Sequence, residues 1–126
     1  LHDSWGEKVS AYLGMTVPGF PNFFMMYGPN TNLGGNSIIF MIECQARYIV
    51  QALNALRSHK RIDVRKGPFA DFQQEMQDRL KTMAWNSGCK SWYQTADGYN
   101  PTNWPGPTAE YRERTANFDA TKYEFA

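Results

Sequence analysis

Apolar residues return every three or four positions between residues 38 and 56, which is the most regular pattern in the chain. This spacing places them on one face of an α-helix. The predicted apolar face consists of Ile38, Ile42, Ile49, Leu53 and Leu56, and the opposite polar face of Glu43, Arg47, Gln51 and Asn54. Because residues 38–42 are apolar nearly all round, we expect the first two turns of this helix to be its most deeply buried part.

A short apolar run, Phe-Phe-Met-Met-Tyr at residues 23–27, precedes this helix and is bounded by turn-forming residues. A continuous apolar run of this length is typical of a strand that is covered on both faces. We therefore predict a buried strand, a polar loop over residues 28–36, and a helix start capped by Asn36 or Ser37. Since few other segments could form strands beside it, we expect the rest of its sheet to lie elsewhere.

The second half of the chain contains a further helical pattern. Residues 61–64 could form a short strand, and a helix is predicted to start at Gly67-Pro68, because proline is tolerated in the first turn. Its apolar positions are Phe69, Phe72, Met76, Leu80 and Met83, its outward polar positions are Gln73, Gln77 and Asp78, and residues 85–88 end it. From Cys89 to Ala126, prolines interrupt every pattern, so we expect an irregular tail rich in aromatic residues.

Charge and cysteine content limit the possible partners. The 126 residues carry 13 Lys and Arg against 12 Asp and Glu, which gives no support for a nucleic-acid or anionic-membrane partner. The predicted helix over 38–56 contains charged and amide side chains, so we do not expect it to span a membrane. Cys44 and Cys89 occur without a secretory signal or a Cys/His cluster, so we expect a reducing, cytoplasmic location and no metal site. The chain starts with Leu1, and we expect it to be part of a longer polypeptide.

The loop between the predicted strand and helix, Gly28 to Ser37, is where the sequence indicates chemistry. Its Asn and Thr side chains supply hydrogen-bond donors, and Gly34 and Gly35 allow a ligand to approach the backbone closely. The free N–H groups at a helix N-terminus favour an anion or a polarised carbonyl. The alternative is an ordinary loop between strand and helix, in which Asn and Gly serve the turn geometry.

Three stretches of the first half, residues 11–24, 27–34 and 36–43, resemble the C-terminal flavin segment of class B flavoprotein monooxygenases, the Baeyer–Villiger type. They read AYLGMTVPGFPNFF, YGPNTNLG and NSIIFMIE, and are most similar to the acetophenone-monooxygenase-like branch. The resemblance implies an α/β fold, in which the predicted strand and long helix are the last elements of an FAD-binding Rossmann-like domain. Residues 1–60 would then belong to the FAD-binding domain, and residues 61–126 would form a C-terminal helix and a loop-rich tail.

The resemblance also implies which residues bind ligands. The flavin ring would lie against Asn30, Thr31, Asn32, Leu33, Gly34, Gly35 and Asn36, and Ile38 would lie near the substrate cavity. Trp92, in the Ser-Trp-Tyr segment at 91–93, matches a family tryptophan that reaches toward the nicotinamide cofactor and the substrate pocket. The helix N-terminus would stabilise negative charge on the reduced flavin by about 0.3–2 kcal/mol. We expect no catalytic side chain and no metal ligand in this chain.

Several parts of such an enzyme are missing from the sequence. Neither of the two GxGxxG motifs that bind FAD and NADPH is present, and the family's Phe-x-Gly-x-x-x-His-x-x-x-Trp-Pro fingerprint is absent. We therefore predict a C-terminal fragment, inactive alone, of an enzyme that uses NADPH, FAD and O₂ to oxidise a ketone or a soft heteroatom of a small organic substrate. Its partners would be the missing N-terminal FAD and NADPH domains. The alternative is a small α-rich interaction domain without flavin chemistry.

Overall fold

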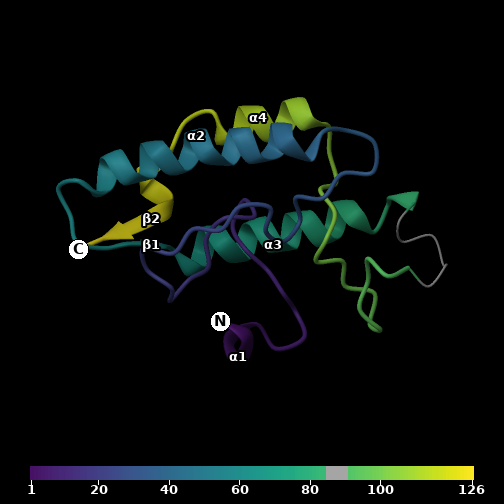
Figure 1. The fold of residues 1–126 in the computed structure, drawn as a ribbon. Helices are drawn as coiled ribbons and strands as arrows, with labels where there is room; N and C mark the ends of the chain where they lie inside the picture. The colour runs from purple at the N-terminus through teal and green to yellow at the C-terminus, as the bar shows by residue number, and fades with distance from the viewer. Residues whose placement is uncertain (85–90) are drawn as a thin grey trace.

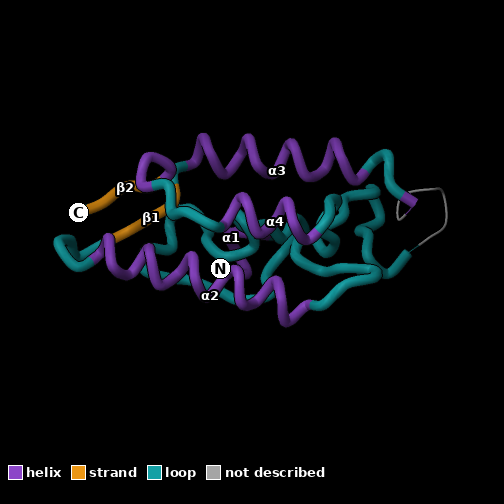
Figure 2. The backbone as a smooth tube through the Cα atoms, turned by 90° about the horizontal axis from the view of Figure 1, so that it is seen from above, coloured by secondary structure: helices purple, strands orange, loops and turns teal. Residues whose placement is uncertain are grey.

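The computed structural model describes residues 1–84 and 91–126, and most of its regular structure is helical. The elements in chain order are α1 (His2–Trp5), α2 (Ile38–Leu56), β1 (Ile62–Val64), α3 (Lys66–Leu80), α4 (Thr108–Thr115), the 3₁₀ helix η2 (Ala120–Lys122) and β2 (Tyr123–Phe125). Figure 1 shows α4 lying along α2 above α3, and Figure 2, seen from above, shows α4 between the two longer helices. The described part of the chain is therefore a small helical unit, and its β structure is limited to the pair β1 and β2.

The long helix α2 has the bounds that the hydrophobic pattern predicts. Ser37 precedes it, and its Oγ accepts a hydrogen bond from the backbone N of Phe40 at 3.4 Å, which confirms the predicted cap. The buried residues, however, are Met41, Cys44, Gln45, Tyr48 and Ala52. The predicted apolar face is confirmed in part, because Ile49 and Leu56 pack against the core while Leu53 is 48% exposed. The predicted deep burial of the first two turns is wrong, since Ile39 is 69% exposed. The core lies on a neighbouring side of the helix, where a glutamine and a tyrosine combine burial with hydrogen bonds.

Residues 23–27 do not form the predicted buried strand. Phe23 is 38% exposed, and Met26 and Tyr27 are each 44% exposed. In the described part of the chain no strand lies alongside this segment, because the sheet there consists of β1 and β2. Burial on both faces would need neighbouring elements that residues 1–84 and 91–126 do not supply.

The short strand β1 and the helix α3 are found where the sequence predicts them. Pro68 lies in the first turn of α3, where its missing N–H group is tolerated. Phe72, Met76 and Leu80 are buried along one face of the helix, as their spacing predicts. α3 ends at Leu80, and both the end predicted at residues 85–88 and the turn position of Cys89 lie outside the described residues.

The outward orientation predicted for two glutamines of α3 is wrong. Gln73 donates from Nε2 to the carbonyl oxygen of Ala11 at 2.9 Å. Gln77 donates from Nε2 to the carbonyl oxygen of Asn100 at 2.9 Å, and its Oε1 accepts from the backbone N of the same residue at 3.0 Å. Loop backbone crosses this side of the helix, so its polar side chains satisfy peptide groups instead of facing water.

The C-terminal part is not the irregular tail that its prolines suggest. After Pro107, α4 forms with Tyr111 and Thr115 buried, and β2 then pairs antiparallel with β1, with Ile62 opposite Phe125. The eight residues of α4 are too few to show a clear helical period in the sequence. Pro107, with φ of −68°, precedes the helix and starts it instead of breaking it.

A hydrophobic core joins both halves of the chain. It is formed by Leu13, Met15, Met41, Cys44, Tyr48, Ala52, Ile62, Val64, Phe72, Met76, Trp104, Tyr111 and Tyr123. Two ion pairs join α3 to α4. Arg79 on α3 pairs with Glu110 on α4, with Nη1 2.6 Å from Oε1, and Arg114 on α4 pairs with Glu75 on α3. The proposed division of the chain near residue 60 stays a prediction.

Candidate functional site

The turn over residues 28–37 leads directly into the N-terminus of α2, and its two halves are held differently. In the first half, Asn30 has a left-handed backbone conformation, with φ of 57°, and is 1% exposed. Asparagine adopts this conformation more readily than most residues. The Asn30 Nδ2 donates to the carbonyl oxygens of Asn100 at 2.9 Å and Asn103 at 3.0 Å, and the backbone N donates to that of Pro101 at 2.7 Å.

Asn32 fastens the same turn to the same loop. Its backbone N donates to the carbonyl oxygen of Thr102 at 3.0 Å, and its Nδ2 donates to Oδ1 of Asn103 at 3.0 Å. Thr31 is buried before it, with Oγ1 donating to the carbonyl oxygen of Gly28 at 2.6 Å. We call the four asparagines that join the two loops the asparagine clamp: Asn30, Asn32, Asn100 and Asn103.

Two glycines let the N-terminal segment support the turn. Gly14 has φ of 71°, and a Cβ atom at this position would overlap Cγ2 of Thr31. A Cβ atom on Gly28 would overlap the carbonyl oxygen of Gly14. The backbone of residues 12–16 therefore lies directly against the turn, and a side chain at either glycine would push the two segments apart.

The second half of the turn is open. Leu33 and Ile38 are half-buried, while Gly34, Gly35 and Asn36 between them are exposed. A Cβ atom on Gly35 would meet nothing within 4 Å. The N-terminus of the 19-residue helix α2 lies beside this stretch. A planar group with partial negative charge could approach the backbone here.

Gln45 connects the segment entering the turn to the core. Its Oε1 accepts a hydrogen bond from the backbone N of Tyr27 at 2.8 Å, and its Nε2 donates to the hydroxyl of Tyr111 at 2.9 Å. That hydroxyl donates in turn to the carbonyl oxygen of Leu13 at 2.6 Å. Burial raises the pKa of Tyr111, so the hydroxyl keeps its proton at neutral pH. The position of the turn relative to α2 is thus fixed by buried hydrogen bonds.

A surface hollow of about 430 Å³ lies beside the held half of the turn. It is lined by Trp5, Val9, Met25, Met26, Tyr27, Gly28, Pro29, Asn32, Pro101 and Thr102. The hydroxyl of Tyr27 donates to Oδ1 of Asn32 at 2.8 Å within this lining. An apolar wall with a few fixed polar groups is suited to an organic ligand or to a neighbouring segment of polypeptide.

Trp92 lies on the loop that leads to the asparagine clamp. It is 82% exposed, and its ring lies tilted against that of Tyr93, with 4.0 Å between the ring centroids. An indole that is exposed to this extent offers a face to a planar ligand. The role that the family resemblance implies for Trp92 stays a prediction.

The described part of the chain contains no group of three or more His, Cys, Asp or Glu side chains arranged to hold a metal ion. Among the same residues, no helix combines the length and apolar character needed to cross a bilayer.

The residues that hold the turn from outside were not identified from the sequence. Asn100 and Asn103 occur in the order Asn-Pro-Thr-Asn, which by itself indicates a turn. Their partner Asn30 lies about 70 positions earlier, as the separations of 70 and 73 residues show. A contact over such a distance leaves no periodic signal in a single sequence.

Relatives of known family match nearly the whole chain. The chain is 41% identical over 128 residues to a Baeyer–Villiger monooxygenase of Streptomyces coelicolor, an alignment that covers 98% of this chain and 25% of that protein. It is 38% identical over 123 residues to the FAD-binding monooxygenase ktnD of Aspergillus niger, covering 92% of this chain and 20% of that protein. No family model matches the chain.

The fold is shared with a solved monooxygenase structure. An oxidised steroid monooxygenase bound to NADP superimposes with a TM-score of 0.82, covering 98% of this chain and 24% of its own, at 24% sequence identity. The chain thus spans about a quarter of the length of the relatives it matches, and the matching part is C-terminal. By its sequence, the chain belongs to the Baeyer–Villiger monooxygenases, as the counterpart of their C-terminal quarter.

Proposed function

We propose that this chain is the C-terminal part of an FAD- and NADPH-dependent monooxygenase. The whole enzyme would insert one oxygen atom of O₂ into a ketone, the Baeyer–Villiger oxidation, or transfer it to a soft heteroatom. The observation that carries the proposal is the half-held, half-open turn at the N-terminus of α2, in a chain 41% identical to the matching part of a Baeyer–Villiger monooxygenase. The flavin supplies the redox chemistry when bound, and this chain supplies position and charge.

The two halves of the turn have different parts in this proposal. Leu33, Gly34, Gly35 and Asn36 would contact the flavin ring, because this stretch is open and lies beside the helix N-terminus. Asn30, Thr31 and Asn32 would shape the site by holding the turn, since the side-chain donors of all three bond within the chain. Ile38 would face the substrate cavity, and Trp92 would extend toward the nicotinamide cofactor.

The proposal also assigns a place in the larger fold. Residues 23–27, the turn and α2 would be the last strand, loop and helix of a Rossmann-like FAD-binding domain comprising residues 1–60. Residues 61–126 would form the C-terminal extension of that domain, in a cytoplasmic enzyme. The chain alone would be inactive, because its sequence has neither of the GxGxxG motifs that hold the FAD and NADPH diphosphates.

A chimera tests the proposal. The matching C-terminal quarter of the Streptomyces coelicolor relative is replaced by this chain, and the product is compared with the isolated chain. We expect the chimera to purify with bound FAD and to oxidise NADPH faster when a ketone is added. The isolated chain, supplied with FAD, should not oxidise NADPH. A well-folded chimera without FAD would contradict the proposal.

Two glycine substitutions identify the open half of the turn as the flavin contact. Gly35→Leu should remove FAD from the chimera, because the new side chain occupies the space that the ring would need. Gly67→Leu is the matched control, since a Cβ atom on Gly67 also meets nothing within 4 Å. Both variants should leave the circular dichroism of the isolated chain unchanged.

An interaction domain without flavin chemistry is the second candidate. It is favoured by the large apolar side chains that α2 exposes, Ile39 and Val50 above all. Under this function, Gly35→Leu and Gly67→Leu would behave alike in every assay, and the partner of the domain would not need to bind FAD.

A further inference from the structure

A groove of about 490 Å³ lies between α2 and α4. Cys44 and Thr115 line it although they are only 3% and 1% exposed, so they form its floor. Gln51 joins its two walls, since Nε2 donates to the carbonyl oxygen of Ala116 at 3.0 Å and Oε1 accepts from the backbone N of Phe118 at 3.0 Å. The two walls are therefore held in a fixed position relative to each other.

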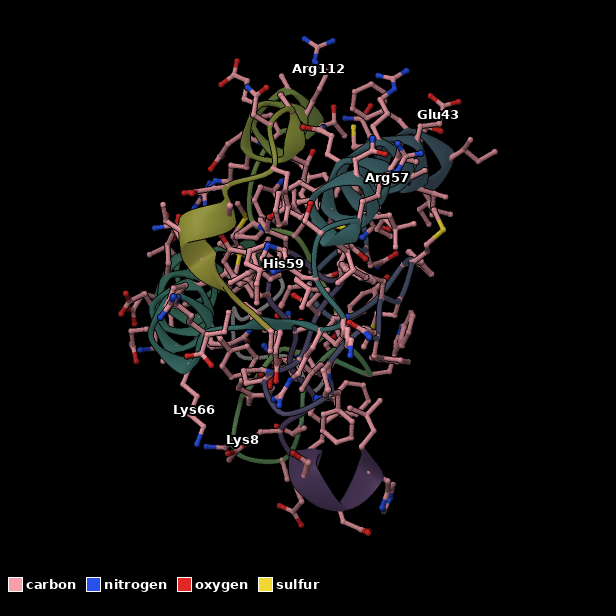
Figure 3. The ribbon with its side chains drawn as sticks, turned by 90° about the vertical axis from the view of Figure 1, so that its left-hand side faces the viewer. Lys8, Glu43, Arg57, His59, Lys66 and Arg112 are labelled. Carbon is pink, nitrogen blue, oxygen red and sulfur yellow. The ribbon has the colours of Figure 1, made fainter. Side chains whose placement is uncertain are left out.

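Two exposed arginines form the rim of this groove. Arg47 lines it from α2 and Arg112 from α4. Figure 3 shows Arg112 extending from α4 on the side away from α3. Within residues 1–84 and 91–126, neither arginine has a carboxylate partner, and Arg112 lies over the ring of Phe40 with 6.0 Å to the ring centroid. The positive charge of both side chains is therefore left available to a ligand.

Most of the other arginines are used within the chain. Carboxylate partners are present for Arg61, Arg65, Arg79 and Arg114. Besides Arg47 and Arg112, only Arg57 lacks an ion pair in the described part of the chain, and it is not part of the groove. Two of the three unpaired arginines thus line the same hollow.

The acidic groups near the groove do not cancel this charge. Glu113 also lines it, and Glu43 lies one turn before Arg47 on α2, but neither forms an ion pair with Arg47 or Arg112. Two cations against one anion leave the lining with a net positive charge. Burial raises the pKa of the Cys44 thiol, so the floor adds no negative charge at neutral pH.

The floor itself offers contact area and little hydrogen bonding. The hydroxyl of Thr115 already donates to the carbonyl oxygen of Tyr111 at 2.8 Å, and the neutral thiol of Cys44 behaves as a small apolar group. A charged rim above such a floor suits a ligand that carries an anionic group on an apolar body. Guanidinium groups bind carboxylates through paired hydrogen bonds, which are among the strongest that proteins form.

We propose that the groove between α2 and α4 is a binding site for a small organic acid. Its carboxylate would bind between Arg47 and Arg112, and its apolar part would lie on the floor over Cys44 and Thr115. The groove shares no lining residue with the turn over residues 28–37. The inference therefore goes beyond the proposed function and does not depend on flavin binding.

Three related compounds test the two parts of the site. Octanoate, octanamide and acetate are titrated into the ¹⁵N-labelled chain, and the shifts of its backbone amide signals are followed by NMR. Octanoate should shift the amides around Cys44, Arg47 and Thr115. It should bind about tenfold or more tightly than octanamide, which lacks the charge, and than acetate, which lacks the apolar body.

Substitutions in the rim test the role of each charge. Arg47→Gln and Arg112→Gln should each weaken octanoate binding about tenfold or more. Arg57→Gln is the matched control, because it removes an exposed and unpaired arginine outside the groove, and it should leave the affinity unchanged. Glu113→Gln should strengthen binding by removing the opposing charge, an effect that a loss of folding could not produce.

Several outcomes would overturn the site. Equal affinities for octanoate and octanamide would mean that the arginines do not hold the carboxylate, and inorganic phosphate binding as tightly as octanoate would mean that the floor does not contribute. Shifts centred on the exposed Val50 instead of the groove would show general adsorption to apolar surface.

The chimera extends the test to the larger protein. It should bind octanoate as the isolated chain does. Loss of binding in the chimera would show that the remaining polypeptide covers the groove, and it would overturn the site. The FAD content of the same chimera tests the proposed function separately, so that the two can fail independently.

Discussion

The two faces of α2 differ in whether their packing is completed within this chain. On the inner face, Met41 and Gln45 are fully buried and Tyr48 is 1% exposed. On the outer face, Ile39 and Val50 are more than half exposed. The described chain thus leaves the apolar side chains of Ile39, Val50 and Leu53 exposed, while Ile49 and Leu56 on the same helix pack against the core.

The difference shows what each face is for. The inner face carries polar atoms with fixed partners: Gln45 bonds Tyr27 and Tyr111, and the Tyr48 hydroxyl donates to that of Tyr123 at 3.2 Å. Buried hydrogen bonds of this kind specify one arrangement, because a wrong arrangement leaves them unpaired. The exposed side chains of Ile39 and Val50 have no polar atoms that could specify an arrangement in this way, and the exposed Glu43 lies one turn from Ile39.

The largest expected effect is on the inner face. Met41→Ala removes a fully buried side chain from the core and should lower the free energy of unfolding by about 2–5 kcal/mol. Urea denaturation of the isolated chain, followed by circular dichroism, measures the loss. A change below about 1 kcal/mol would mean that Met41 is not packed as the structure shows.

Removing the polar link between the turn and the core should have a smaller effect. Gln45→Leu keeps the size of the side chain but leaves the Tyr27 N–H without its acceptor and the Tyr111 hydroxyl without its donor. Because the Tyr111 hydroxyl keeps its bond to the carbonyl oxygen of Leu13, the loss should be about 1–3 kcal/mol in total, partly offset by the added apolar contact.

The matched control for this change lies on α3. Gln74→Leu removes an exposed glutamine whose side chain bonds Asp78, and it should change the urea midpoint little. Equal effects of the two glutamine substitutions would contradict the role given to Gln45.

The outcome for α2 also shows which parts of the fold a single sequence reveals. Its bounds follow from Ser37 and from an uninterrupted helical period, and β1 and α3 follow from equally local signals. The buried face of α2 does not follow from the sequence. Apolar residues recur on more than one side of this helix, and their spacing does not show which side the chain covers. The strand predicted at 23–27 is not formed, because the described residues supply no neighbouring strand for it.

The candidate site divides in a similar way. The open stretch from Leu33 to Asn36 is visible as a Gly/Asn turn before a helix, and its place in the structure agrees. The asparagine clamp and Gln45 could not be predicted, since their partners lie far away in sequence. α4 was missed because eight residues after a proline carry too short a pattern.

A pH change should affect the ion pairs between α3 and α4, which lie behind the inner face of α2. Hydrogen bonding to Arg114 lowers the pKa of Glu75, and hydrogen bonding to Arg79 lowers the pKa of Glu110. Because both folded-state pKa values lie below the unfolded value of about 4.3, the stabilisation is present above that pH. It should be lost as the pH falls through the folded-state values.

Urea midpoints measured between pH 7 and pH 3 check this sign. The midpoint should fall below about pH 4.3, and Glu110→Gln should flatten the fall. Since both carboxylates are partly exposed, we expect a modest effect. A midpoint that rises on acidification would contradict the ion pairs between α3 and α4.

The smallest expected effect is on the outer face. Ile39→Ser should change the free energy of unfolding of the isolated chain by less than about 0.5 kcal/mol, because the side chain it removes is 69% exposed. Met41 lies two positions away on the same helix. Comparing Ile39→Ser with Met41→Ala therefore compares the two faces within one helix and by one measurement. In the FAD-loaded chimera the same Ile39→Ser change should be clearly destabilising, since the side chain would then be covered. A loss in the isolated chain as large as that of Met41→Ala would show that both faces are packed within this chain, and the contrast between them would not hold.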